Sequence, residues 1–208
     1  MTIAKQIAQP RPDRRVEILD AAERCFSRAG FHQTSMNEIC VEAGMSPGNL
    51  YRYFPSKEAI ISGIAERNRA HAAEKFSAVA DAPDFFAGMR LLARHHFVER
   101  SDQELGLCAE IMAESRRNPS VAKVFTQIES DIHARLEAML REASERGEIS
   151  RNLDFSAAAT MLMIVADGMM WHRASDPKFD AEKMLPYMFQ MIKHMLSGGI
   201  NLSSQEKP

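Results

Sequence analysis

The stretch of sequence that decides the fold is TSMNEICVEAGMSPGNLYRYF, residues 34–54. Thr34 or Ser35 can cap a first short helix, and Glu38 stands three residues after Ser35, in the position of a capping box. That helix is predicted over 36–43. Gly44 then ends it, because glycine readily adopts the left-handed conformation found just past a helix C-terminus.

A second short helix is predicted after a tight turn. Ser46 can cap it, Pro47 occupies its first position, where a missing N–H does no harm, and it ends near Phe54. Two helices joined through a glycine need a small residue at their crossing and apolar residues that hold both against a third helix. Cys40 is the small residue, and the apolar positions are Ile39, Met45 and Leu50, with Phe26 and Phe31. The pattern favours a helix-turn-helix, although a plain helical hairpin has the same spacing.

The remaining segments also show the apolar spacing of helices, and none alternates as a strand does. We therefore expect an all-α fold of about nine helices. A helix from Asp13 to Gly30 precedes the quoted stretch, and Ser56 caps the helix after it. Pro186 should kink the last helix or delay its start. The later helices are predicted over Lys57 to about Val79, Asp81-Ala82-Pro83 to about Glu99, Asp102 to Arg117, Asn118-Pro119 to Gly147, Asp154 to Arg173, and Asp180 to Gly198-Gly199.

These elements divide the chain into four parts. Residues 1–12 are expected to form a flexible arm, and residues 13–56 a helix-turn-helix domain. Residues 57–200 should form a larger helical domain, and residues 201–208 a frayed tail. The long helix that begins at Lys57 would join the two domains rigidly.

Composition and charge narrow the function. The chain has 208 residues, of which 45% are hydrophobic and 26% charged, so it can bury a sizeable core. Its net charge is −2, yet the segment through Lys57 holds eight basic and six acidic residues, which allows a DNA-facing end without proving one. Three scattered cysteines argue against a disulfide framework or a zinc site. No apolar run has the length of a signal sequence or a membrane span, so we expect a cytoplasmic protein without metal or cofactor.

The quoted stretch and its surroundings resemble the N-terminal signature of TetR-family transcriptional regulators. The resemblance covers about residues 13–60. Cys40 departs from the alanine that is usual in the family, but it is small enough to keep the crossing. The matching residues are Phe31, Thr34, Ser35, Ala43, Gly44, Met45, Ser46, Gly48, Leu50, Tyr51, Tyr53, Phe54, Lys57 and Glu58.

The resemblance implies roles for residues that meet DNA. Phosphate contacts would come from Thr34, Tyr51, Tyr53 and Lys57. Ser46, Pro47, Gly48, Asn49 and Arg52 would meet bases or adjacent phosphates, with Arg52 able to read a guanine through both of its forked donors or to hold a phosphate instead. Arginines 11, 14 and 15 would either add minor-groove contacts or remain solvated.

Two late helices carry more apolar surface than one small domain can cover. The helix over about 154–173 is apolar on nearly every face, and the helix over about 181–198 is similarly rich. A homodimer that pairs these helices in a four-helix interface explains the excess, as in TetR-like dimers. Burial of both within one subunit is the alternative. Two-fold symmetry would place two recognition helices about 34–36 Å apart, on a palindromic operator of double-stranded DNA.

A small-molecule effector is also implied by the resemblance, and the 14 methionines suit an adaptable cavity or simply a core. The ligand itself is unknown. The candidate pocket residues are Phe97, Met112, Arg116, Phe125, Met163, Asp167 and Trp171. Further polar candidates are His95, His96, Glu110, His133 and His172, although a lone histidine is more often a surface or core residue.

Two other functions are weighed against a ligand-responsive repressor. An all-helical enzyme finds no support, because no nucleophile with its base, no metal-ligand spacing and no phosphate loop is present in the sequence. A DNA-binding dimer without small-molecule input shares every sequence feature named above. Only a ligand-dependent loss of DNA binding separates it from the sensor.

Overall fold

The computed structural model describes residues 13–79 and 82–199, and that part of the chain contains nine α-helices, two short π-helical segments and no strand. The expected all-α fold is therefore confirmed. The expected flexible arm over 1–12 and the tail over 201–208 lie outside the described residues, as does Asp81.

Three helices form an N-terminal unit, which we call the reading unit: α1 (Arg14–Ala29), α2 (Met36–Glu42) and α3 (Pro47–Tyr53). Ser35 caps α2 in the predicted capping box, since its hydroxyl accepts from the Glu38 N–H while the Glu38 carboxylate accepts from the Ser35 N–H. Gly30 and Gly44 follow α1 and α2 with φ of +78° and +62°, which glycine adopts without strain. The predicted helix ends are thus confirmed.

The core of the reading unit extends beyond its three helices. The predicted clamps Ile39, Leu50 and Phe26 are fully buried, and Cys40 lies among them. The same cluster also contains Ile60, Ile61 and Ile64 from α4, Leu107 from α6 and Val121 from α7. The reading unit is therefore built partly from residues far along the chain, and its packing does not stop at residue 56.

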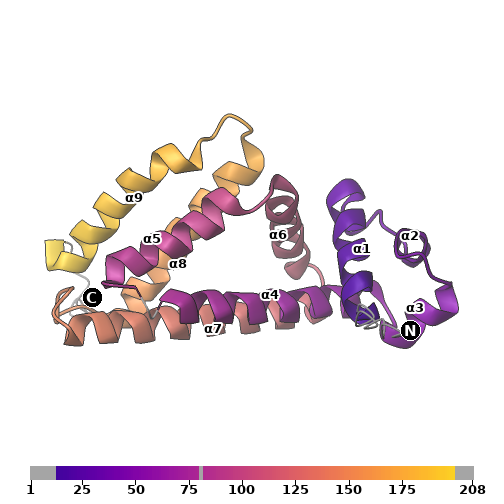
Figure 1. The fold of residues 1–208 in the computed structure, drawn as a ribbon, viewed down its shortest axis with the longest axis horizontal. Helices are drawn as coiled ribbons and strands as arrows, with labels where there is room; N and C mark the ends of the chain where they lie inside the picture. Colours follow the sequence, from indigo (N-terminus) through magenta and orange to yellow (C-terminus); the bar gives the residue numbers. More distant parts are fainter. Residues whose placement is uncertain (1–12, 80–81, 200–208) are drawn as a thin grey trace, which may run out of the picture.

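Six further helices form the body: α4 (Lys57–Val79), α5 (Phe85–Arg94), α6 (Asp102–Ser115), α7 (Pro119–Glu145), α8 (Phe155–Ser175) and α9 (Ala181–His194). The π-helical segments η1 (His95–Glu99) and η2 (Met195–Gly199) extend α5 and α9. α4 and α7 run side by side along one edge, and α6 stands between the reading unit and the remaining helices (Figure 1).

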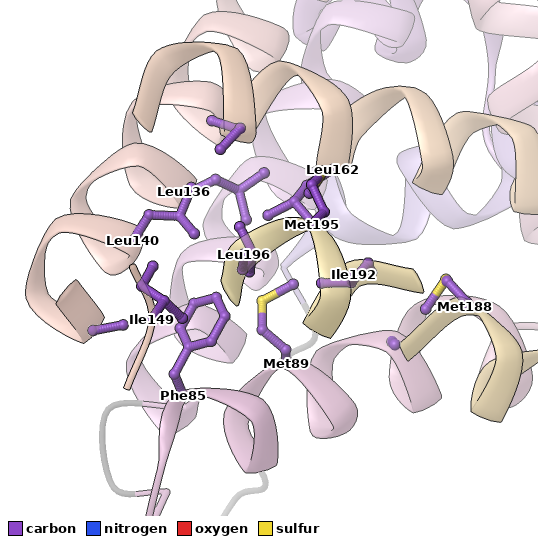
Figure 2. Close-up of a cluster of buried hydrophobic side chains, with 14 of the residues drawn as sticks. Phe85, Met89, Leu136, Leu140, Ile149, Leu162, Met188, Ile192, Met195 and Leu196 are labelled. Atoms are coloured by element: carbon purple, nitrogen blue, oxygen red, sulfur yellow. The ribbon is translucent and has the colours of Figure 1, made fainter. Parts of the chain in front are cut away.

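The body has its own hydrophobic core at the end far from the reading unit. Phe85 and Met89 from α5 meet Leu140 from α7, Leu162 from α8 and Ile192 from α9 (Figure 2). Two cores, one in the reading unit and one in the body, therefore hold the molecule together.

One predicted helix cap needs correction. Ser101, not Asp102, caps α6: its hydroxyl accepts from the Glu104 N–H, and the Glu104 carboxylate accepts from the Ser101 N–H. Pro186 does not delay α9, which begins at Ala181 and continues through the proline. Asn118, Asp154 and Asp180 cap α7, α8 and α9 as expected.

Candidate nucleic-acid interface and effector region

The N-terminal half of α3 is exposed. Ser46, Pro47 and Gly48 face solvent at its start, and no described atom lies within 4 Å of a Cβ built on Gly48. The Ser46 hydroxyl makes no capping bond with the described residues, so it is free to meet a ligand. Asn49 is half-buried beside them. This end of α3 has the polar, sterically open character that close approach to a base edge requires.

Three longer side chains extend the same helix toward solvent: Tyr51, Arg52 and Tyr53 are all exposed. Arg52 has no ion-pair partner among the residues that the structure describes. By contrast, Arg24 and Arg28 both contact Glu42, with Arg24 Nε 2.7 Å from Glu42 Oε1. The hydrogen bond from Arg24 lowers the pKa of the Glu42 carboxyl and keeps it charged. Arg52 is therefore an exposed guanidinium without an ion-pair partner among the described residues.

Thr34 and Lys57 are engaged inside the protein. Thr34 is 2% exposed, and its hydroxyl lies 2.9 Å from the Gly30 carbonyl oxygen and 3.2 Å from that of Cys25. Lys57 donates from Nζ to the Phe31 carbonyl at 2.7 Å and lies over the Phe31 ring. The Thr34 hydroxyl is therefore engaged by the chain itself, while Gln33 and Asn37 near it are exposed polar side chains that the sequence analysis did not name.

The predicted effector residues lie on different elements and in different environments. Phe97 is buried in η1, and Met112, Phe125, Met163 and Asp167 are half-buried on α6, α7 and α8. Arg116 and Trp171 are exposed, Trp171 by 59%. The structure does not gather these side chains around either hollow that it records: one of about 480 Å³ lined by Arg141, Ser144, Glu145, Arg151 and Phe155, and one of about 250 Å³ lined by Phe76, Ala82, Pro83, Asp84, Phe85, Met139, Glu142 and Arg146.

Two half-buried carboxylates lie near each other between α7 and α8. Burial raises the pKa of Asp167, and burial together with the charge of Asp167 raises the pKa of Glu129. Sequence reasoning named Asp167 but missed Glu129, because only the packing of α7 against α8 brings the two together.

The histidines named from the sequence have ordinary structural roles. His133 lies 3.1 Å from the Ser156 carbonyl oxygen, His95 lies 3.2 Å from Glu99, and His172 stacks on Phe179. Burial, reinforced by the positive charge of Arg100, lowers the pKa of His96 to about 4. Within the described residues no cluster of three metal-ligating side chains occurs, and no helix is long and apolar enough to cross a membrane.

An apolar surface runs along α8 and α9. Met161, Ile164 and Trp171 are exposed on α8, and Met184, Tyr187 and Met191 are exposed on α9, each set at a spacing that places it on one side of its helix. We call these six residues the α8–α9 face. They make up six of the eleven exposed large hydrophobic residues in the described part of the chain, so the apolar surface is concentrated on these two helices.

Comparisons with known proteins agree with this geometry. Residues 18–64 match the family described as bacterial regulatory proteins, tetR family, and residues 90–197 match the C-terminal domain of BetI-type transcriptional repressors. The HTH-type transcriptional regulator UidR of Escherichia coli K12 is 34% identical over 160 residues, which cover 75% of this chain and 79% of UidR.

Solved structures show the same likeness. Salmonella enterica GusR superposes with a TM-score of 0.76 and 34% identity, covering 93% of this chain and 98% of GusR. The regulator FadR from Bacillus subtilis, solved in complex with stearoyl-CoA, gives a TM-score of 0.68 at 20% identity, covering 89% of this chain and 99% of FadR. The likeness to FadR is one of fold.

Proposed function

The chain belongs to the TetR family of bacterial regulatory proteins, and from this premise we propose that it is a repressor that binds a palindromic operator as a homodimer and is released by a small-molecule effector. DNA binding through a helix-turn-helix and a role in transcription regulation come with membership of the family. Repression, the operator symmetry and the effector are the proposed parts.

The exposed N-terminal half of α3 is the observation that carries the proposal. Ser46, Pro47 and Gly48 can approach base edges, and Arg52 adds a guanidinium with no partner in the described residues. Phosphate contacts would come from Tyr51 and Tyr53, which donate through their phenolic hydroxyls. Lys57 would either place its charge near the DNA backbone or, as in this structure, hold the loop before α2 through its hydrogen bond to the Phe31 carbonyl oxygen.

The homodimer is proposed from the α8–α9 face. Six exposed large hydrophobic residues on two helices that contact each other call for a partner, and a second copy of the same two helices supplies a matching surface. Pairing of α8 and α9 with their symmetry mates would form the four-helix interface expected from the sequence. The dimer would then present two α3 helices to successive turns of the DNA.

Release by an effector is proposed from family membership and from FadR, whose structure was solved with stearoyl-CoA. The effector would have to prefer one arrangement of the reading unit, since a shift from 1:99 to 99:1 takes about 5.5 kcal/mol of differential binding. The seven predicted effector residues, Phe97, Met112, Arg116, Phe125, Met163, Asp167 and Trp171, remain candidates for that site. We propose further that the protein acts in the cytoplasm, where the DNA is, and catalyses no reaction.

Selection of duplexes from a random DNA library tests the DNA part. We expect a palindromic motif with half-sites about 10 base pairs apart. Arg52→Ala should weaken binding to the selected duplex and reduce the salt slope by about one if Arg52 meets a phosphate, or relax one base position if it meets a guanine. Arg151→Ala, an exposed arginine on the α7–α8 loop, is the control and should leave both unchanged. Failure to enrich any duplex would refute the proposal.

The sensor part is tested by thermal unfolding in the presence of a metabolite library, with stearoyl-CoA as the first probe. A compound that binds the folded protein raises Tm, because ligand binding to the native state alone stabilises it. A true effector must also release the selected duplex. A library in which every stabilising compound leaves the duplex bound would favour the DNA-binding dimer without small-molecule input.

A further inference from the structure

The turn between α6 and α7, residues 116–118, carries two adjacent arginines. Arg116 and Arg117 are both exposed. Arg116 makes no ion pair or side-chain hydrogen bond with the residues that the structure describes. Arg117 has one carboxylate within reach among them, that of Glu114, whose Oε2 is 3.9 Å from Arg117 Nε and so too far for a hydrogen bond. Two guanidinium groups therefore stand on this turn with their donors unused by the described part of the chain.

The backbone of this turn is fixed by hydrogen bonds. The N–H groups of Arg117 and Asn118 both donate to the Glu114 carbonyl oxygen, each at 2.9 Å. The Asn118 side chain then accepts from the Ser120 N–H at 3.1 Å and caps α7. The backbone that carries the two arginines is therefore ordered before any ligand arrives, so that only their side chains lose freedom on binding.

The turn lies next to the reading unit. Glu114 is 4% exposed, and its Oε2 lies 2.7 Å from Nε2 of His32, in the loop that leads into the Ser35 cap of α2. Lys57, the first residue of α4, donates from Nζ to the His32 carbonyl oxygen at 3.3 Å. Val121, in the first turn of α7, is buried in the core of the reading unit. The end of α6 and the start of α7 accordingly lie beside that unit in Figure 1.

The chemistry of this edge of the reading unit points to a phosphate. A DNA backbone that passes the start of α2 and of α4 would pass the α6–α7 turn as well. Thr34 and Lys57, from which phosphate contacts were expected there, both have their polar groups engaged within the protein. Arg116 and Arg117 do not, and a guanidinium binds phosphate oxygens through two parallel N–H donors. The free donors at this edge are therefore those of the two arginines.

We propose that Arg116 and Arg117 form a phosphate-binding site for the DNA backbone on the α6–α7 turn, outside the helix-turn-helix. The inference rests on the proposed function, since it needs a duplex to which the protein binds. A contact of this kind adds affinity without reading sequence, because phosphates carry no base identity. Arg116 is also a candidate effector residue, and the experiment below separates the two roles.

The salt dependence of binding to the selected duplex tests the contact. Each phosphate contact that is lost should lower the salt slope by about one unit, so Arg116→Ala, Arg117→Ala and the double variant should show progressively smaller slopes. At low salt the double variant should bind about tenfold more weakly, and equally so on an unrelated duplex of the same length. Arg151→Ala, on the α7–α8 loop, removes the same charge and should leave the slope unchanged.

Uncharged phosphates in the DNA locate the contact. In duplexes that carry one methylphosphonate at a time, at least one position in each half-site should weaken binding of the wild type but not of the double alanine variant, because the two losses concern one pair. Arg116→Lys with Arg117→Lys keeps both charges and should retain most of the slope. The Tm of the double alanine variant should match that of the wild type, since neither guanidinium makes a hydrogen bond within the described residues.

Three results would overturn the proposal. An unchanged slope in the double alanine variant means that neither arginine meets a phosphate. An equal fall in Arg151→Ala means that net charge, and not a contact, is responsible. If Arg116→Ala keeps its slope but is no longer released by an effector, Arg116 belongs to the effector site. A wild-type protein that selects no duplex would instead refute the proposed function, and the slopes on the unrelated duplex would still decide whether the turn binds phosphate.

Discussion

Gly63 of α4 packs closely against the reading unit, and the structure leaves no space for a side chain at this position. A Cβ at this position would lie 2.9 Å from Phe54 Cε1 and 3.0 Å from Leu19 Cδ2. Both neighbours are buried, so neither can swing aside. Gly63→Ala should therefore lower the free energy of unfolding by about 1–3 kcal/mol, measured by urea unfolding at fixed protein concentration.

Gly106 provides the control for the Gly63→Ala variant. It lies inside α6, and no described atom comes within 4 Å of a Cβ built there. Gly106→Ala should raise the stability by up to about 1 kcal/mol, because alanine restricts the unfolded chain and favours the helix. If Gly63→Ala were equally harmless, the close packing of α4 under α1 would be wrong.

His96 makes stability depend on pH. Its pKa is lowered from 6.5 to about 4, first by burial and then by Arg100 and His95. The unfolded chain therefore binds a proton at this histidine more readily than the folded chain, and stability is lost as the pH falls through about 6.5 toward 4. His96→Gln cannot titrate, so between about pH 7.5 and pH 5 it should lose less stability than the wild type. Parallel losses in urea unfolding would contradict the lowered pKa of His96.

At the scale of single helices, α2 and α3 differ in how they begin. Ser35 accepts from the Glu38 N–H in a complete capping box, whereas the Ser46 hydroxyl makes no such bond in the described residues. Ser35→Ala should cost about 0.5–2 kcal/mol of stability. Ser46→Ala should change stability by less than about 0.5 kcal/mol and instead weaken duplex binding. Thermal unfolding and duplex titration of both variants check this, and a large stability loss at Ser46 would count against its availability to DNA.

The segment η1 depends on a side chain from another helix. Arg173 of α8, which is largely buried, donates to the carbonyl oxygens of Phe97 and Arg100, the second at 2.7 Å. Carbonyls at the end of a π-helical segment lack partners of their own. Arg173→Met should lower the free energy of unfolding by about 2–4 kcal/mol, because each hydrogen bond to a charged group contributes about 1.5–3 kcal/mol.

Two further variants, also measured by urea unfolding, test whether the loss of stability is specific to the Arg173 guanidinium. Arg173→Lys should recover little, since one ammonium cannot reproduce the forked guanidinium. Arg141→Met removes an exposed ion pair with Glu137 and should cost less than about 1 kcal/mol. Equal effects at Arg173 and Arg141 would show that η1 does not need its partner from α8.

Helix boundaries were predictable because capping residues and glycines in the local sequence mark them. Asn118, Asp154 and Asp180 cap their helices, and Gly30 ends α1, as the sequence indicated. The start of α6 was misplaced by one residue because Ser101 and Asp102 are both good caps, and only the reciprocal bond from Glu104 distinguishes them. The π-helical segments were not predicted, since no capping residue or glycine pattern in the sequence marks a π-helix; η1 contacts both α8 and α9.

The site was predictable only where a residue's role depends on its own helix. The exposure of Ser46, Gly48 and Arg52 follows from their positions at the open side of α3. The internal engagement of Thr34 depends on carbonyls of α1, and the partnership of Glu114 with His32 joins residues 82 positions apart. Such contacts depend on how helices cross, which no local pattern encodes.

At the scale of the whole molecule, α6 and the α8–α9 face have complementary roles. The α8–α9 face would fix the two protomers relative to each other, while α6 links each body to its own reading unit. The distance between the two α3 helices therefore depends on the contact between the protomers and on the contact of α6 with the reading unit. A change at either one would alter how the dimer fits two half-sites.

The α8–α9 face gives the prediction for the assembly. Ile164 on α8 and Leu91 on α5 are each 56% exposed, so the two residues differ in location and not in exposure. Ile164→Asp would place a charge in the proposed interface, where it cannot be hydrated, and should convert the dimer to a monomer at micromolar concentration. Leu91→Asp should leave the dimer intact. Sedimentation of both variants measures this directly.

The same pair of variants connects assembly to function. A monomer carries one α3 helix and loses the second half-site, so Ile164→Asp should bind the selected duplex at least about a hundredfold more weakly, as expected when two linked binding events become one. Leu91→Asp should bind as the wild type does. If Ile164→Asp stays dimeric, the apolar residues on α8 and α9 serve another purpose. If it becomes monomeric and still binds with full affinity, the two reading units do not act together, and the palindromic operator would be the part of the proposal to abandon.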